Sequence, residues 1–213
     1  HKPVKQGACL YYTPGRPLDA DMRRALRMML YLEPPVIAAQ RSSDVINAVF
    51  YGTLKPHEMA WLAPWNDVVS IFPPGISFEK FEWFSRGLNS GGEARWSGAP
   101  FTDLFSGWVV DISMPVVANG TVRGVAVINM APRTLARKYL TKSSRRLLFV
   151  GPDMTLMYLT ETARAVLDLH VLEDFNYTRQ MKENTFAPTQ FKLSDSSQRP
   201  EIRALADMIV SGK

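Results

Sequence analysis

Two polar side chains, Asp111 and Asn129, stand on a stretch of the chain that is otherwise almost wholly apolar. The stretch covers residues 107–130, and both of its arms are rich in valine and isoleucine. A polar group that is buried in such surroundings needs a hydrogen-bond partner, which is a neighbouring residue, a water molecule or a ligand. These two residues are therefore the first candidates for chemistry, and their positions depend on how the stretch folds.

The pair Asn119-Gly120 lies between the two arms, and Asn-Gly is the strongest short-range signal for a β-hairpin. We predict an antiparallel hairpin with a type I′ turn at this pair. Counting outward from the turn places Val110 opposite Asn129, and directly opposed side chains share a face unless a bulge changes the register. One face is then predicted to carry Trp108, Val110, Ile112, Met114, Val125, Val127 and Asn129, and the other Asp111, Ser113, Gly124, Ala126 and Ile128.

Histidine and cysteine chemistry has little support in this sequence. The three histidines, His1, His57 and His170, are widely separated and have no Cys, Asp or Glu at ligand spacing, so no metal site is predicted. Cys9 is the only cysteine, which excludes an internal disulfide and a cysteine-based zinc site. No nucleophile elbow, phosphate-binding loop or zinc-protease motif is present. We therefore predict no cofactor and no catalytic residue.

Composition is that of an ordinary globular protein. The chain has 213 residues, 46% hydrophobic and 21% charged, which is enough for one large or two small cores. The formal net charge of +5 is dispersed, and the close basic pairs Arg23-Arg24 and Arg145-Arg146 are too short to predict nucleic-acid binding. No apolar run approaches the roughly 20 residues that span a bilayer, and no signal peptide pattern opens the chain, so it is expected to be soluble as given.

Helical spacing over residues 18–33 predicts an N-terminal helix, with Asp19 or Asp21 as its N-cap and Pro34-Pro35 as its end. The predicted elements that follow it are a strand over 45–54, a helical turn over 57–62, a strand over 68–72, and a helix over 78–88 capped by Ser77.

After the central hairpin, Pro132 is predicted to open a helix over 133–140. The later predicted elements are a second hairpin from 146–150 and 156–159, a helix within 162–172, and a terminal helix over 200–210. The restart of the pattern near Lys142 predicts a second domain, either small or truncated.

The order and spacing of several motifs resemble the extracytoplasmic double Cache family, the PAS-like sensor domains of bacterial membrane receptors. The resemblance rests on FEKFEWFSRGLNSGGEARWSGAPFTD and GWVVDISMPVVANGTVRGVAVINMAPRTL. Trp83-Phe84 lies where the family has Trp-Tyr, and Pro100-Phe101-Thr102-Asp103 where it has Pro-Tyr-x-Asp. Asn129 lies where the Gly-Val-x-x-x-Asp strand has its Asp. The match is good over 78–135, suggestive over 18–72 and weak after 142.

The resemblance implies an α+β fold, in which a PAS-like antiparallel sheet has flanking helices and a long N-terminal helix. Residues 1–41 would form the N-terminal helical segment, 42–141 the membrane-distal ligand-binding domain, and 142–213 a smaller or incomplete membrane-proximal Cache-like module. It also implies a periplasmic or extracellular sensing domain of a histidine kinase, chemoreceptor or similar receptor. Such a domain is tethered by membrane segments outside this chain and pairs weakly with a second copy.

The resemblance places a small organic ligand between the hairpin sheet and the segment 78–103. In the amino-acid-binding subset, an Arg two residues before the Trp holds the ligand carboxylate, and the turn Asp and strand Asp hold its ammonium. Phe81 and Asn129 replace the first and last of these, so an organic acid, an amine or a larger apolar metabolite is expected instead of a free α-amino acid. The candidate ligand-binding residues are Phe81, Trp83, Phe84, Arg86, Trp96, Phe101, Asp103 and Asn129.

Each candidate also has a purely structural interpretation. Asp103 can cap a turn, Asn129 can bond to backbone, and the aromatic residues can be core. Arg86 can replace the missing guanidinium or lie on a solvated helix face. For the whole chain, the alternatives to a sensor are a PAS-like dimerisation module that binds no ligand and a soluble enzyme that uses acidic residues.

Overall fold

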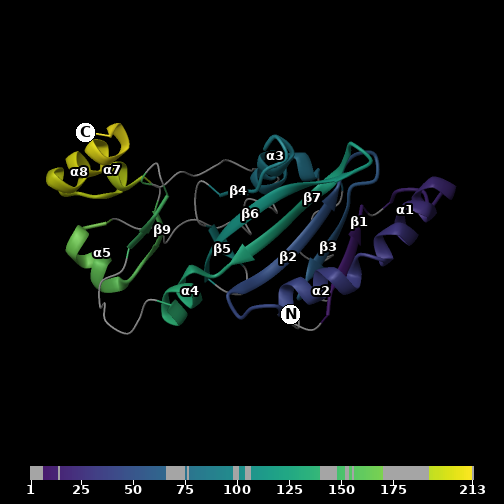
Figure 1. Ribbon diagram of the computed structural model, residues 1–213, viewed down its shortest axis with the longest axis horizontal. Helices are drawn as coiled ribbons and strands as arrows, with labels where there is room; N and C mark the ends of the chain where they lie inside the picture. The colour runs from purple at the N-terminus through teal and green to yellow at the C-terminus, as the bar shows by residue number, and fades with distance from the viewer. Residues whose placement is uncertain are drawn as a thin grey trace. The chain divides into compact units, whose positions relative to one another are not determined.

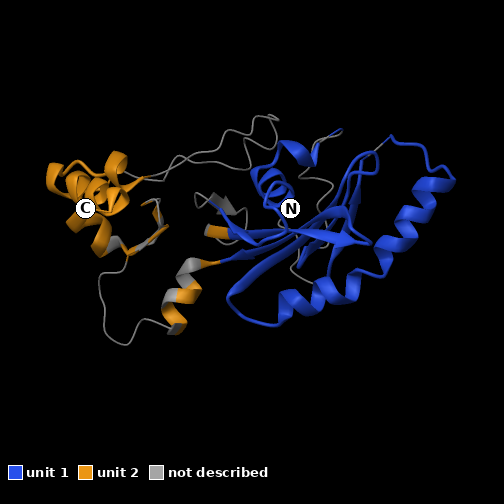
Figure 2. Ribbon diagram, turned by 45° about the horizontal axis from the view of Figure 1, so that its top comes forward, with its two compact units in different colours: residues 1–97, 111–130, 178–186 blue, residues 98–110, 131–177, 187–213 orange. Residues whose placement is uncertain are grey.

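The structure is a computed structural model that describes most of the chain, in two compact units (Figure 2). One unit contains residues 1–97, 111–130 and 178–186, and the other contains 98–110, 131–177 and 187–213. The described residues are 7–13, 15–65, 75, 77–97, 101–103, 107–139, 148–151, 154, 156–169 and 192–212. The strand predicted over 68–72 lies outside them.

A seven-stranded sheet forms the centre of the fold, with the strand order β1-β3-β2-β7-β6-β4 and β5 paired to the start of β6 (Figure 1). Its strands are β1 (Cys9–Tyr12), β2 (Ile46–Thr53), β3 (Met59–Ala63), β4 (Arg95–Trp96), β5 (Phe101–Asp103), β6 (Gly107–Ala118) and β7 (Thr121–Met130). The recorded registers are antiparallel. The predicted fold class, an α+β fold with a PAS-like antiparallel sheet and flanking helices, is confirmed.

Helices flank this sheet on both faces. The helices of the first unit are α1 (Ala20–Leu30), α2 (Glu33–Arg41), the short 3₁₀ helix η1 (Phe78–Lys80) and α3 (Glu82–Leu88). The second unit contains α4 (Pro132–Tyr139), the strand pair β8 (Leu148–Val150) and β9 (Leu156–Leu159), α5 (Glu161–Leu167), α7 (Leu193–Ser196) and α8 (Pro200–Ser211). The predicted second hairpin and terminal helix are therefore confirmed.

The N-terminal helix begins as predicted but ends differently. Asp19 is its N-cap and accepts a hydrogen bond of 2.8 Å from the backbone N–H of Met22. The prediction that Pro34-Pro35 end this helix was wrong, because α1 ends at Leu30 and the two prolines lie in the first turn of α2. Proline is tolerated there because the first N–H groups of a helix have no acceptor within the helix. The N-terminal segment is thus two helices with a break.

Both helices pack on one face of the sheet. Met22, Met29 and Val36 project from the helices into a core cluster with residues of β2 and β3. Trp61 donates its indole N–H to the Met29 carbonyl, at the break between α1 and α2. The strand residues of this cluster are Val49, Tyr51, Met59, Trp61 and Ala63.

The helical turn predicted over 57–62 was wrong, because β3 occupies Met59–Ala63. All five of its residues are buried, and the strand is paired on both sides, by β1 and β2. A strand buried on both faces shows no alternation of apolar and polar residues, and periodicity cannot distinguish such a short run from a helical segment.

The opposite face of the sheet is covered by η1 and α3 (Figure 1). The single helix predicted over 78–88 is in fact interrupted at Phe81, whose φ of −81° and ψ of 134° are extended, and Ser77 makes no side-chain capping bond. Helix α3 approaches the sheet through Gly87, where an added Cβ would meet Val125 Cγ1 and lie 3.3 Å from Ser113 Cβ. The break and the glycine together let this short helix lie directly on β6 and β7.

The central hairpin has the predicted turn but not the predicted register. Asn119 and Gly120 have φ values of 53° and 71°, as a type I′ turn requires. However, Asn129 donates a hydrogen bond of 3.0 Å to Asp111 Oδ1, so these two side chains share a face. The prediction that they lie on opposite faces was wrong. The 12 residues of β6 against the 10 of β7 imply an extra residue in β6 between the turn and Asp111.

The second unit has a core of its own. Its buried residues come from the hairpin, the short helices and α8, and they are Met154, Leu156, Leu169, Leu193 and Ala206. Among the residues that the structure describes, no helix is long and apolar enough to cross a membrane.

Substitution of Gly87 tests the close contact between α3 and the sheet. We expect Gly87→Ala to destabilise the fold by about 1–3 kcal/mol, because the new methyl group overlaps Val125 and a packed interface cannot absorb it. The measurement is urea unfolding of the purified domain. In a Val125→Ala background the added cost of Gly87→Ala should be smaller, and equal costs in both backgrounds would contradict the proposed contact.

Candidate functional site

A chain of hydrogen-bonded polar side chains crosses the sheet on the face that α3 covers. Asn47 of β2 donates to Asn129 Oδ1 at 2.9 Å, and Asn129 of β7 in turn donates to Asp111 Oδ1 of β6 at 3.0 Å. Asn129 and Asp111 are each 1% exposed. The backbone N–H of Asp111 also donates to Ser97 Oγ at 3.0 Å. Three strands thus contribute to one buried polar cluster that contains a carboxylate.

Helix α3 brings a guanidinium to the same cluster. Arg86 Nε donates to Ser113 Oγ at 3.2 Å, and Nη1 donates at 2.9 Å to Glu82, one helical turn earlier. Its third nitrogen, Nη2, is 4.0 Å from Asp111 Oδ2. Within the described part of the chain, Nη2 is buried and has no hydrogen-bond acceptor. The Arg86 side chain is only 14% exposed, so it lies against the sheet and not on a solvated helix face.

Three of the aromatic candidates, Phe81, Trp83 and Phe84, lie together on this face. The Trp83 ring centroid is 5.3 Å from that of Phe84 and 5.9 Å from that of Phe81, and Phe78 packs against all three. Trp83 also contacts Phe50 of β2. Phe81 and Phe84 are almost fully buried and Trp83 is 9% exposed, so these rings form the apolar core beneath η1 and α3.

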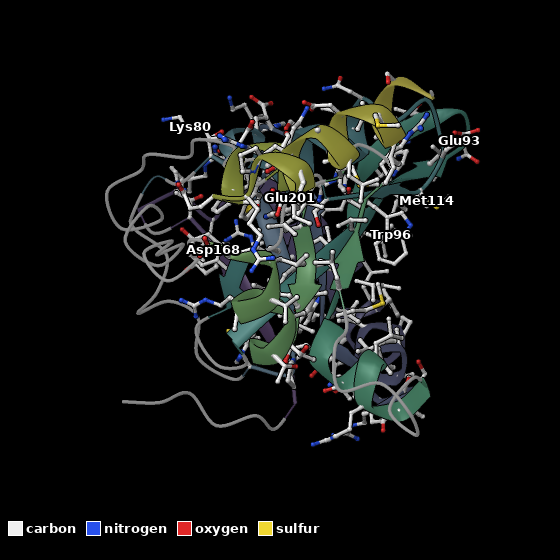
Figure 3. The ribbon with its side chains drawn as sticks, turned by 90° about the vertical axis from the view of Figure 1, so that its left-hand side faces the viewer. Lys80, Glu93, Trp96, Met114, Asp168 and Glu201 are labelled. Carbon is white, nitrogen blue, oxygen red and sulfur yellow. The ribbon has the colours of Figure 1, made fainter. Side chains whose placement is uncertain are left out.

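The remaining candidates lie elsewhere or only partly within the described structure. Trp96 is 52% exposed and pairs with Ile112, which places its side chain on the sheet face opposite Asp111. Figure 3 shows it at the surface with Met114. Phe101 and Asp103 belong to β5, whose backbone pairs with β6 at Val109 and Gly107, but their side chains lie outside the described residues. The structure thus brings Arg86 and Asn129 together and leaves Trp96 apart.

Four residues of the cluster were absent from the candidates chosen on sequence: Asp111, Ser113, Asn47 and Glu82. The slip in register hid Asp111 and Ser113, because counting from the turn puts them on the other face. The Glu82–Arg86 ion pair has the i,i+4 spacing that a sequence shows directly, and it indicates where the guanidinium is held.

The cluster is suited to hydrogen bonding and not to holding a metal. In the part of the chain that the structure describes, no three His, Cys, Asp or Glu residues are grouped as metal ligands require. The Asp111 carboxylate instead has an amide donor at one oxygen and a guanidinium near the other. Charge-assisted bonds of this kind are strong and directional when they are buried.

No family model matches this sequence, and no curated protein matches it either. Among solved structures, the extracellular domain of soHK1S-Z6, described as a histidine kinase, aligns with a TM-score of 0.51 at 10% identity. The alignment covers 76% of this chain and 66% of that one.

Two chemoreceptor domains also align. The ligand-binding domain of the Pseudomonas aeruginosa PAO1 amino acid chemoreceptor PctC, in complex with GABA, has a TM-score of 0.45 at 21% identity, over 70% of this chain and 60% of that chain. That of the Campylobacter jejuni chemoreceptor Tlp3, in complex with 4-methylisoleucine, has a TM-score of 0.46 at 13% identity, over 69% and 57%. This chain therefore spans about 60% of the PctC domain's length.

The likeness to soHK1S-Z6 concerns the fold alone, and it places this chain in a structural class. The chain has the α+β fold of the extracellular domain of a sensor kinase, as its resemblance to Cache domains implied. The matched structures named here are receptor sensor domains and not enzymes.

Removal of the Asp111 carboxylate tests whether the cluster holds α3 on the sheet. We expect Asp111→Ala to destabilise the domain by about 3 kcal/mol, because Arg86 is left as a buried charge without its counterion and Asn129 loses an acceptor. The measurement is urea unfolding. Glu93→Ala, which removes an exposed partner of Arg95, is the control and should cost less than about 1 kcal/mol. Equal costs for the two variants would refute the structural role of Asp111.

Proposed function

We propose that this chain is the extracytoplasmic sensor domain of a membrane receptor, such as a histidine kinase or a chemoreceptor. It would bind a small organic molecule on the sheet face that η1 and α3 cover. The observation that carries this proposal is the buried cluster of Arg86, Asp111 and Asn129, in which a guanidinium nitrogen has no acceptor among the described residues. The fold likeness to a receptor's extracellular domain supports it.

In this proposal the polar cluster orients the ligand, and the aromatic residues of η1 and α3 exclude water around it. Trp83 and Phe84 would line the site from α3, and Phe101 and Asp103 from β5, as the resemblance to Cache domains implies. Membrane segments outside this chain would tether the domain, with residues 42–141 distal to the membrane and 142–213 proximal to it.

Strand β2 offers a path for the signal. Phe50 and Gly52 face the aromatic cluster, while Val49 and Tyr51, on the opposite face of the same strand, belong to the core that packs against α1 and α2. A shift of α3 on ligand binding would therefore change the packing of the N-terminal helices. Such a signal requires only that the ligand bind one arrangement better than the other.

A thermal-shift screen of the purified domain tests ligand binding directly. The panel contains amino acids, organic acids, amines, purines and sugars. A ligand at about 100 times its dissociation constant should add about 2.7 kcal/mol to the folded state and raise the melting temperature. We expect a hit whose shift is lost in Arg86→Gln and reduced in Trp83→Phe and Asp103→Ala.

The matched control is Arg95→Gln, which alters an exposed guanidinium that pairs with Glu93 at the surface. It should leave the shift unchanged. A flat screen, or a hit that Arg86→Gln and Asp103→Ala both retain at full strength, would overturn the proposed site.

Self-association without a ligand is the second candidate function, and the exposed face of α1 favours it. Met28, Leu30 and Tyr31 are 66%, 55% and 79% exposed. Neighbouring apolar side chains that stay in water are typical of interaction surfaces. A second copy of this chain, packed against α1, would bury them in a weak homodimer.

Sedimentation velocity at increasing protein concentration tests this association. We expect a concentration-dependent dimer that Met28→Glu weakens at least tenfold, because a charge would be buried in the interface. Met114→Glu, which changes an exposed methionine of β6, should have no effect. Association together with a flat ligand screen would favour the interaction module, and a strictly monomeric domain would exclude it.

A further inference from the structure

Arg86 has one nitrogen left with which to bind something beyond the protein. Its Nε and Nη1 already donate to Ser113 and Glu82, which fixes the plane of the guanidinium. Nη2 is buried, and no described residue accepts a hydrogen bond from it. A buried donor without an acceptor is costly, so a group that accepts from Nη2 would bind at a favourable position.

Asp111 Oδ2 is the acceptor nearest to that nitrogen. The 4.0 Å between Nη2 and Oδ2 is too long for a direct hydrogen bond, although it is a suitable separation for a polar group that bridges the two. The other carboxylate oxygen, Oδ1, accepts from Asn129, which holds the carboxylate in place. The cluster thus presents one fixed donor beside one fixed acceptor.

The charge of the pair restricts what can bridge it. Arg86 and Asp111 neutralise one another inside the protein, so a ligand with a single charge would add an uncompensated charge to a buried site. A carboxylate is gripped best by two parallel N–H groups, but Nη2 is the one nitrogen of Arg86 not already bonded. An ammonium has three donors to satisfy, and Asp111 Oδ2 is the one acceptor that the pair directs at the gap.

We infer that the Arg86–Asp111 pair selects an uncharged ligand with an amide-type edge, in which a C=O lies next to an N–H. The C=O accepts from Arg86 Nη2 and the N–H donates to Asp111 Oδ2, so both protein groups are satisfied without an added charge. Primary carboxamides and the lactam edges of nucleobases share this chemistry. The inference rests on the function proposed above and names the class of ligand for that site.

Isothermal calorimetry with matched probes tests the selection by charge. The probes are nicotinamide, nicotinate and 3-(aminomethyl)pyridine, which share a ring and differ in whether the substituent is neutral, anionic or cationic, and uracil, which carries a lactam edge. We expect a neutral probe to bind at least tenfold more tightly than both charged probes. Nicotinamide alone would indicate a carboxamide ligand, and uracil alone a nucleobase.

Asp111→Asn makes the test specific to the pair. This isosteric change removes the negative charge, so Arg86 keeps an uncompensated positive charge. We expect the neutral probe to lose at least tenfold in affinity and nicotinate to gain. Circular dichroism confirms that the variant is folded, and Arg95→Gln should leave every affinity unchanged.

Two results overturn the inference and leave the proposed function standing: charged compounds of the wider panel bind in an Arg86-dependent manner while no neutral probe does, or Asp111→Asn retains the wild-type preference. A crystal structure grown with the best neutral probe that shows only a water between Nη2 and Oδ2 would also overturn it. If nothing in the wider panel raises the melting temperature, the proposed function fails as well.

Discussion

The buried carboxylate of Asp111 is the constraint on which the α3 side of this sheet depends. A charge that is 1% exposed must be matched by hydrogen bonds and a counterion, or the fold bears a penalty of several kcal/mol. Asn129 supplies the hydrogen bond only if the two strands pair so that both side chains share a face. Arg86 supplies the counterion only if α3 lies directly on β6. The register of the hairpin and the position of the helix are therefore linked.

Local features of the sequence make that position of α3 possible. The extended backbone at Phe81 turns the chain between η1 and α3, and Gly87 lets the helix approach Val125 and Ser113 without a side chain between them. The rings of Phe78, Trp83 and Phe84 then fill the space toward β2. A low-dielectric surrounding strengthens the electrostatic attraction of the Arg86–Asp111 pair and raises the cost of separating it. Apolar packing and the polar cluster consequently support one another.

Sequence reasoning located the elements that local chemistry determines. The Asn119-Gly120 turn, the Asp19 cap, β9 and the helix that opens at Pro132 all follow from short motifs. It failed where partners distant in the chain decide the outcome. Strand β3 carries no alternation because neighbours bury both of its faces, and Pro34-Pro35 fit the start of a helix as well as the end of one.

The same distinction separates the two halves of the candidate site. Arg86 and Asn129 were identified because each stands near a motif of the Cache resemblance. Asp111 was visible as a polar residue on an apolar strand, but an extra residue in β6, which no local signal marks, decides which face it occupies. Asn47 joins the cluster across a pairing between β2 and β7. A hydrogen-bond network that spans three strands and a helix is a tertiary property, and a single sequence does not contain it.

The cluster also changes how the loss of charge at the family positions is understood. Phe81 and Asn129 remove a guanidinium and a carboxylate from the positions where amino-acid-binding relatives have them. The structure has both groups nearby, from different elements, in Arg86 and Asp111. The difference is that these two groups face each other across 4.0 Å and balance each other before any ligand arrives. A site whose charges are already paired gains little from a charged ligand, because Coulomb attraction to one member is offset by repulsion from the other. Hydrogen-bond geometry, more than net charge, then governs which molecules such a site distinguishes.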